Sequence, residues 1–270
     1  MAGALLLRGM LIGLLAGFLS FGFLKIVGEP PVERAIAFEA QHDAEAAVEA
    51  AHHHHHDTVV AAPQPELVSR KVQAGIGLFT GVIVYSAAFG GLFALAFAVA
   101  WGRIGALDPR ALAAVLAALG LVAVYLVPIL KYPANPPSVG EPETIGTRTA
   151  LYFSMIALSL AAMIAAGMLR KALLQRCGAW NAMLIAGGAY LVTMIAAGWI
   201  LPPVNEVPPE FPAVVLWQFR VASAGGQLIL WVTLGLAFGV AAERAINGNL
   251  SGARLLHARS PAGPVERRWR

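Results

Sequence analysis

Six long apolar runs, separated by polar connections, dominate the pattern of the chain. The runs are residues 5–27, 74–102, 111–130, 149–169, 180–201 and 221–242. Each has about the length that an α-helix needs to cross the roughly 30 Å hydrocarbon layer of a bilayer. Lipid offers the backbone no hydrogen-bond partners, so a span is a helix or part of a closed barrel, and runs this rich in Leu and Ala favour helices. The pattern predicts an all-α polytopic membrane helical bundle with six transmembrane helices arranged as three hairpins.

The first run could instead be a cleaved signal peptide, because one arginine precedes a long apolar stretch. No A-x-A-like cleavage site occurs before Glu29, and Gly9, Gly13 and Gly17 repeat at the four-residue spacing that lets two membrane helices approach closely. These features favour a retained helix; cleavage would leave five spans. Similar pairs of small residues, for which ordinary helix packing is expected, occur at Gly77 and Gly81 and at Gly235 and Gly239.

Composition supports a membrane protein and excludes other classes. The 270 residues are 58% hydrophobic and 13% charged, with a mean hydropathy of +0.69, whereas a soluble domain has roughly a quarter charged residues. The net charge is +4, but the basic residues are scattered at the edges of the apolar runs, which argues against a nucleic-acid partner. Cys177 is the single cysteine, so neither an intrachain disulfide nor a cysteine-based metal site is expected.

The distribution of Lys and Arg predicts the orientation of the chain. If both termini lie inside, most of these residues fall in inner segments, including the short loop 170–176 and the C-terminal tail. The positive-inside rule therefore predicts cytoplasmic termini and an external histidine-rich loop. The predicted regions are a first transmembrane helix at 1–27, an external acidic and histidine-rich loop at 28–73, a five-helix membrane bundle at 74–242, and a disordered basic cytoplasmic tail at 243–270.

Three external connections, residues 28–34, 132–148 and 201–212, combine paired prolines with carboxylates. Paired prolines cannot continue a helix, so these connections should be stiff and extended. Their carboxylate and amide oxygens repeat on one side of the membrane, which indicates a shared funnel into a transport path, although Pro-rich stretches also simply end helices at the membrane edge. The candidate pathway mouth consists of Glu29, Glu33, Asn135, Glu141, Asn205 and Glu206.

Five consecutive histidines lie in the first external loop, in the sequence EAAHHHHHDT at residues 49–58. The preceding stretch contains many helix formers and no Gly or Pro, which predicts a helix. On such a helix five ligand-bearing residues share one face, because they follow one another at steps of three and four; they are His42, Glu45, Glu49, His52 and His56. The full set of candidate metal ligands is His42, Glu45, Glu49, His52, His53, His54, His55, His56 and Asp57.

Imidazole and carboxylate ligands together suit cobalt, nickel, copper and zinc, whereas magnesium and calcium prefer oxygen ligands alone. A metal-concentrating role is favoured over one high-affinity site, because adjacent imidazoles offer many overlapping coordination sets. The alternative is a solvated low-complexity linker that binds metal adventitiously; a purification tag does not fit a tract embedded between two spans.

The apolar runs carry few groups that could do chemistry. No His, Asp, Glu or Lys lies near the centre of a run, which argues against a bis-histidine haem and a buried proton relay. The chain has no G-x-x-x-x-G-K-[ST] phosphate loop and no visible catalytic set, so we expect neither an enzyme nor a bound prosthetic group. The polar and sulfur-bearing residues of the spans, each more commonly a packing residue, are Gln73, Tyr85, Ser86, Ser154, Ser159, Thr193, Gln227, Met155, Met163 and Met194.

Several motifs together resemble one known family. They are GEPPVERAI at 28–36, the histidine tract, LKYPANPPSVGEPETIGTRTALY at 130–152 and LPPVNEVPPEFPAVVLWQFR at 201–220. With them the chain resembles, over nearly its whole length, the CbtA family, the predicted cobalt transporter subunit of bacteria. The resemblance implies cobalt uptake across the bacterial cytoplasmic membrane, often linked to cobalamin supply, and a small single-span, histidine-bearing partner of the CbtB type. The family is commonly described with five spans, and the chain lacks the H-x-x-x-x-D-H pattern of nickel/cobalt permeases.

The leading hypothesis is therefore a membrane subunit of a cobalt(II) uptake transporter, in which external histidines and carboxylates concentrate metal for passage through the helical bundle. Nickel(II) or zinc(II) are further candidates, because the ligand types do not select cobalt. The alternative is a metal-binding sensor or accessory subunit that captures transition metal and delivers it to another permease.

Overall fold

The computed structural model of the protein describes residues 2–53 and 68–258, and these residues form helices and connections without a β-strand. Within these two ranges, five helices are long and apolar enough to cross a membrane. They are Gly3–Glu45, Arg70–Ala100, Pro109–Lys131, Pro142–Ile200 and Ala213–Gly248. The all-α prediction is confirmed, and the length and composition of the helices support a multi-pass membrane protein.

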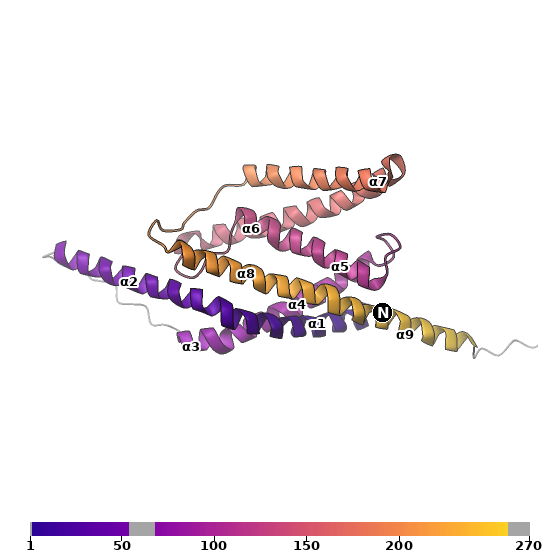
Figure 1. Ribbon diagram of the computed structural model, residues 1–270, viewed down its shortest axis with the longest axis horizontal. Helices are drawn as coiled ribbons and strands as arrows, with labels where there is room; N and C mark the ends of the chain where they lie inside the picture. Colours follow the sequence, from indigo (N-terminus) through magenta and orange to yellow (C-terminus); the bar gives the residue numbers. More distant parts are fainter. Residues whose placement is uncertain (1, 54–67, 259–270) are drawn as a thin grey trace, which may run out of the picture.

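Most of these long helices contain a π-helical turn, which divides them into shorter labelled elements (Figure 1). The first comprises α1 (Ala2–Phe23), the π-turn η1 (Leu24–Gly28) and α2 (Glu29–His53). The second comprises α3 (Arg70–Val72), η2 (Gln73–Gly77) and α4 (Leu78–Ala100), and the third α5 (Pro109–Gly120), η3 (Leu121–Leu126) and α6 (Val127–Lys131). The 3-10 turn η4 (Pro142–Thr144) precedes α7 (Ile145–Ile200), and the last helix comprises α8 (Ala213–Thr233), η5 (Leu234–Phe238) and α9 (Gly239–Ala258).

Consecutive helices run in alternating directions along one long axis, and α7 reverses direction within itself (Figure 1). The reversal occurs at Gly178, whose φ of +77° and ψ of 168° lie outside the helical region and suit glycine, so that 145–177 and 179–200 form two arms. One end of the molecule, named here the α2 end, carries α2, α3 and the connections 132–144 and 201–212. The opposite end, the α9 end, carries the start of α1, the turn of α7 and α9 (Figure 1).

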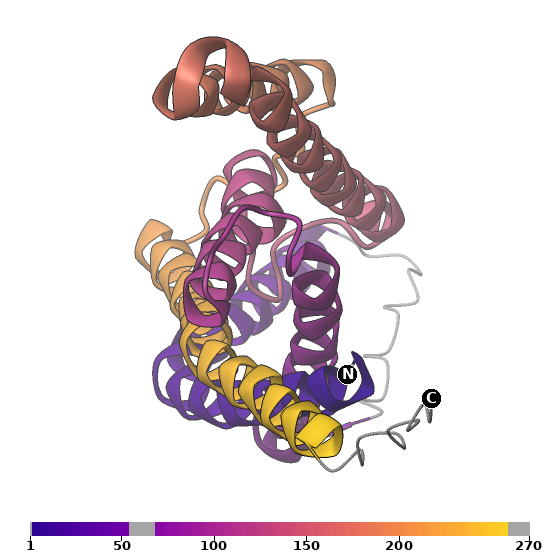
Figure 2. The same cartoon turned by 90° about the vertical axis from the view of Figure 1, so that its right-hand side faces the viewer.

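The core joins α1, α4, α5, α8 and α9, and α7 lies to one side of it (Figure 2). The closest approach is between α1 and α4, where glycines face backbone. A Cβ atom on Gly9 would lie 2.3 Å from the Gly90 carbonyl oxygen, and one on Gly13 would lie 2.3 Å from the Ser86 carbonyl oxygen. The predicted close packing of the first helix is confirmed, because only glycine allows two helices to approach this far.

The arms of α7 pack on each other and on the end of α6. Tyr132, Met155, Tyr190 and Met194 form a small buried cluster there, and the hydroxyls of Ser159 and Tyr190 are 2.8 Å apart. The other faces of the arms expose large apolar side chains, among them Trp199, which is 89% exposed. Apolar exposure on this scale fits a helix pair surrounded by lipid.

The connection at 28–34 is helical, so the prediction that its paired prolines make it extended is wrong. In the preceding turn η1, the N–H of Glu29 donates to the carbonyl of Leu24, five residues back. Pro30 and Pro31 directly follow this wide turn, as the second and third residues of α2, where the α-helical hydrogen-bond pattern is already interrupted. α1 and α2 therefore form one continuous rod. The other two Pro-rich connections are irregular at 132–141 and 201–212, whereas residues 142–148, which were also expected to be extended, form η4 and the start of α7.

α2 is fixed to the bundle at its base. Ala35 is fully buried, Phe38 contacts Phe211 edge to face with ring centroids 5.2 Å apart, and the Ser138 hydroxyl donates to Glu39 at 2.7 Å. Every residue from 40 to 45 is exposed. The prediction of a helix before the histidine tract is confirmed, and the helix projects about 20 Å past Glu39.

α9 continues to Ala258, through a stretch that was expected to be disordered. Its beginning is held against α5, because Glu243 pairs with Arg110 at 2.6 Å and because Ala245 and Ile246 are buried in the core. Because of these contacts, the last helix continues beyond residue 242, where the sixth apolar run ends. Residues 259–270 lie outside the described residues.

Candidate functional site

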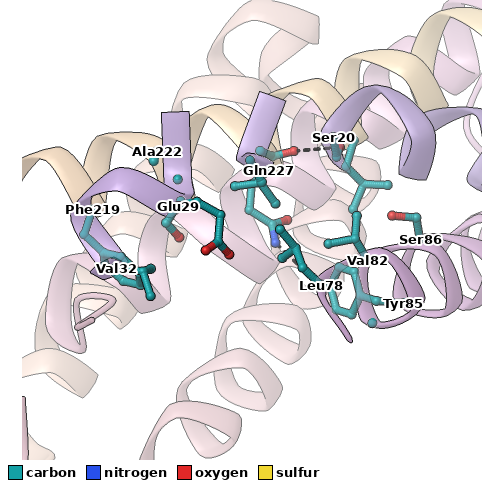
Figure 3. A pocket seen from close by; sticks show the side chains of 16 residues that line it. Ser20, Glu29, Val32, Leu78, Val82, Tyr85, Ser86, Phe219, Ala222 and Gln227 are labelled. Carbon is teal, nitrogen blue, oxygen red and sulfur yellow. Dashed lines mark hydrogen bonds between the residues drawn. The ribbon is translucent and has the colours of Figure 1, made fainter. Parts of the chain in front are cut away.

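A cavity of about 500 Å³ lies between α1, α2, α4 and α8, in the half of the bundle nearest the α2 end. Its apolar and small lining residues are Leu24, Gly28, Val32, Leu78, Gly81, Val82, Phe219, Ala222, Gly226 and Leu230. Its polar lining residues are Ser20, Glu29, Tyr85, Ser86, Ser223 and Gln227. Figure 3 shows Glu29 toward one end, Ser20 and Ser86 toward the other, and Gln227 and Leu78 between them.

Small residues at helix contacts create this space. A Cβ atom on Gly81 would meet no atom within 4 Å, which contradicts the expectation that this glycine serves ordinary helix packing. Gly28, Ala222 and Gly226 bring α8 close to the rod of α1 and α2 without filling the gap, and the Ser20 hydroxyl donates to the Gly226 carbonyl at 3.2 Å. The helices are thus joined at their contacts while the volume beside Gly81 stays open.

The lining of the cavity offers neutral oxygen atoms, some of them on its open side, where Tyr85 is 42% exposed. The Gln227 amide nitrogen donates to the Tyr85 hydroxyl at 3.3 Å, and the Tyr125 hydroxyl donates to Ser223 Oγ at 3.2 Å. Ser86 is almost completely buried, at 1% exposure. Hydroxyl and amide oxygens at membrane depth are able to replace some of the waters around a hydrated cation, as the pore-lining groups of ion channels do.

Glu29 is the charged group of the cavity. It is the first residue of α2, it is 8% exposed, and its Oε2 lies 2.5 Å from Nη2 of Arg70, the first residue of α3. A second cation stands nearby, because Lys25 in η1 donates to the Ala74 carbonyl in η2 at 2.9 Å. Glu29 is thus paired with Arg70, and the contact from Lys25 to Ala74 joins η1 to η2 close to this pair along both helices.

Toward the α9 end the bundle is closed by aromatic packing. Leu230 lines the cavity, and the next residue, Trp231, belongs to a buried cluster with Phe93, Phe97 and Phe238. Phe238 contacts Phe93 and Phe97 edge to face, with ring centroids 5.4 and 5.2 Å apart. The cavity is thus bounded by apolar rings on the side away from Glu29.

A second polar group joins the two irregular connections at the α2 end. The Glu206 carboxylate accepts hydrogen bonds from the Glu141 N–H and the Thr144 hydroxyl, both at 2.9 Å, and lies 3.4 Å from Arg148 Nε. Arg220 donates to Asn135 Oδ1 at 2.9 Å. These side chains hold 132–148, 201–212 and the start of α8 together, so they act as structural clamps.

The Glu141 N–H, the Thr144 hydroxyl and the Arg148 guanidinium hold the pKa of Glu206 below its ordinary value of 4.5. A depressed pKa stabilises the folded state fully above pH 4.5, and this stabilisation is lost as the pH falls from 4.5 through the depressed value. We expect Glu206→Gln to lower the melting temperature of the detergent-solubilised protein by a few degrees at neutral pH. The difference from the parent should shrink on acidification below 4.5, and an equal difference at all pH values would contradict this role.

The model of the family described as "Probable cobalt transporter subunit (CbtA)" matches residues 2–243, nearly the whole chain. The chain belongs to the CbtA family. No curated protein and no solved structure matches it significantly. Membership confirms the resemblance found in the motifs, and it confirms that this is a transporter subunit and not an enzyme. As a subunit of a cobalt transporter, a CbtA chain has partner subunits and a metal ion as its substrate.

The candidate metal ligands of this CbtA chain are described only in part. His42 and Glu45 are exposed on α2, and Glu49 and His52 lie on the same helix. His53 is the last residue of α2, whereas His54, His55, His56 and Asp57 lie outside the described residues. Among the side chains that the structure describes, no three His, Cys, Asp or Glu residues come together in a way that could hold a metal ion.

The candidate mouth of the CbtA chain divides into groups with different surroundings. Glu29 lines the cavity, whereas Asn135 and Glu206 are engaged by arginines. Glu141 contributes its backbone N–H to the clamp, and Glu33 and Asn205 are exposed. Tyr85, Ser86 and Gln227 were identifiable as polar span residues. Ser20 and Ser223 carry the same signal, a hydroxyl within an apolar run, but were not singled out, and no sequence pattern connects Arg70 with Glu29.

Proposed function

We propose that this chain is the membrane subunit of a cobalt(II) uptake transporter and that the cation enters through the cavity beside Glu29. The observation that carries the proposal is the combination of one buried carboxylate with neutral hydroxyl and amide oxygens in a 500 Å³ space between α1, α4 and α8. A carboxylate attracts a divalent cation at the entrance, and neutral oxygens let it move on, because binding in a conduction path must not be too strong.

Six membrane crossings account best for the arrangement. The two arms of α7 are antiparallel, and each is long enough to cross a bilayer. With α7 counted twice, three hairpins result, each with its connection at the α2 end. Retention of the first helix is supported by its position, since it packs along α4 and supplies Ser20 and Leu24 to the cavity wall.

The proposed orientation places both termini in the cytoplasm and the histidine-rich loop outside, in the bacterial cytoplasmic membrane. Among the described residues, the start of α1, the turn of α7 and α9 bring Arg8, Arg176 and Arg244 to the α9 end, and the positive-inside rule assigns such residues to the cytoplasm. A divalent cation that enters then moves down the membrane potential and gains about 2.3 kcal/mol per charge for each 100 mV. No nucleotide site is needed in this subunit to drive uptake.

The histidine-rich loop is proposed to raise the metal concentration outside the cavity. α2 supports this role because it is one helix that begins at Glu29, beside the cavity, and exposes His42 and Glu45 to solvent. The ligands suit nickel(II) and zinc(II) as well as cobalt(II), so selectivity must arise elsewhere. A small single-span, histidine-bearing subunit of the CbtB type is the proposed partner, and the imported cobalt is proposed to supply cobalamin.

The test is uptake of radiolabelled cobalt by cells that express the chain alone or together with its partner subunit. We expect accumulation above that of cells expressing neither, and no accumulation in either case would contradict transport. Deletion of residues 49–57 should weaken the apparent affinity several-fold and leave the maximal rate unchanged. Complete loss of uptake on deletion would instead favour a sensor or accessory subunit that delivers metal to another permease.

A further inference from the structure

The Glu29 carboxylate is buried beside a guanidinium that neutralises it. Burial of an ionised carboxylate without a partner strongly destabilises a fold, so an ionised Glu29 needs a positive charge beside it. In the structure this charge comes from Arg70, at 2.5 Å. Glu29 also lines the cavity, and it is the only carboxylate among the described residues that does so.

The fit of Arg70 to this position is incomplete. Arginine usually binds a carboxylate through two parallel hydrogen bonds, whereas within the described residues Arg70 is joined to Glu29 by Nη2 alone, and its Nε is buried without a hydrogen-bond partner. An unsatisfied buried donor is uncommon in folded proteins. Arg70 is the first residue of the long helix Arg70–Ala100, and its side chain is 30% exposed, so solvent reaches part of it.

We infer that Glu29 is a ligand of the transported divalent cation and that Arg70 is a tethered cation which occupies the carboxylate until the metal displaces it. This inference rests on the proposed function. Exchange of one positive partner for another keeps the buried carboxylate neutralised in both the empty and the loaded state. The metal would complete its coordination with retained water and with neutral oxygens of the cavity, and a volume of about 500 Å³ has room for several waters, each with a share of about 30 Å³.

The exchange makes Arg70 a competitor of the metal, so its removal should increase metal affinity at the cavity. The histidines of the first loop would mask this effect, so the measurement uses the full chain with His42→Ala and with alanine in place of all five histidines of the tract. Equilibrium dialysis of the purified protein against radiolabelled cobalt then reports the remaining binding. We expect Arg70→Gln to tighten it by about tenfold or more, the size of effect that a neighbouring opposite charge has on a carboxylate.

Three further variants test the assignment. Glu29→Gln, alone and combined with Arg70→Gln, should abolish the binding that Arg70→Gln strengthens. Arg34→Gln is the matched control, because Arg34 is an exposed arginine of α2 that contacts Gln218 and the Pro30 carbonyl and does not line the cavity. It should leave cobalt affinity unchanged. Unchanged or weaker binding in Arg70→Gln, or full binding in Glu29→Gln, would overturn the inference.

Arg70→Gln leaves a buried carboxylate without its partner, so this variant could unfold in the absence of metal. In that case cobalt should raise its melting temperature, and it should not do so in the double variant with Glu29→Gln. Absence of this cobalt-dependent stabilisation would also overturn the inference. Binding and melting are measured without transport, so the two ideas fail separately. A chain that exchanges Arg70 for cobalt but imports no cobalt contradicts the proposed function alone. A chain that imports cobalt without this exchange contradicts the present inference alone.

Discussion

Replacement of Gly81 by tryptophan is expected to reduce cobalt uptake by about tenfold or more without unfolding the protein, because pore dimensions control the passage of an ion. Gly81 lines the cavity, and a Cβ atom there meets nothing within 4 Å, so the new side chain enters open space and not a packed contact. Gly81 is an exposed part of the lining, and the indole would extend from it over the opening of the cavity. Radiolabelled cobalt uptake, normalised to the amount of protein in the membrane, measures the effect.

Two control variants separate blockage from other effects. Gly81→Ala adds one carbon to the same place and should retain most of the uptake. Gly188→Trp places the same large side chain on α7, at a glycine whose Cβ likewise meets nothing within 4 Å and which does not line the cavity. It should transport like the parent. Normal uptake in Gly81→Trp would remove the cavity from the path of the ion.

Replacement of Gly90 by alanine is expected to destabilise the protein by about 1–3 kcal/mol or more, the usual range for overpacking a close contact. A Cβ atom there would lie 2.1 Å from the Gly9 carbonyl oxygen and 2.9 Å from the Gly13 Cα. Both are backbone atoms, so α1 and α4 must separate to admit the methyl group. Unfolding of the detergent-solubilised protein by heat or denaturant, followed by circular dichroism, measures the loss.

Gly91, the next residue of α4, provides the matched control. A Cβ atom on Gly91 would lie 3.3 Å from Met10 Cγ and 3.5 Å from Leu6 Cδ1, and these flexible side chains can move aside. Gly91→Ala should therefore leave stability nearly unchanged, with the same gain in helix propensity as Gly90→Ala. Equal stabilities for the two variants would mean that the contact between α1 and α4 does not depend on glycine.

Much of the fold was predictable because membrane helices follow from local composition. Each apolar run of the sequence lies in a long helix of the structure, and the glycines at positions 9, 13 and 17 marked the face along which the first helix packs. The reversal at Gly178 separates the fourth and fifth runs. In contrast, the helical connection at Pro30 and Pro31 was missed, because the rule that prolines end helices assumes ordinary α-helical turns before them.

The candidate site was predictable only in part, because a cavity is a property of several helices at once. Glu29 was identifiable as a carboxylate at the membrane edge, and Tyr85 and Gln227 as polar groups within spans. These residues line one cavity only because α1, α4 and α8 pack against one another, and no feature of the sequence predicts that packing. The same holds for Arg70, which lies far from Glu29 along the chain and reaches it only through the fold.

The sequence alone determined that this chain is an all-helical membrane protein of a cobalt transporter family with a histidine-bearing loop. The length of the apolar runs, the spacing of the glycines and the motifs are all local features, so they can be read without the fold. The tertiary structure decided which polar residues share a cavity and which carboxylates are already engaged by arginines. Glu29 precedes a proline pair and Glu206 follows one, and each carboxylate is paired with an arginine, yet Glu29 lines the cavity whereas Glu206 clamps two connections. The physical reason is that the packing of helices far apart in the sequence determines which groups lie beside a buried charge, and local sequence does not predict that packing.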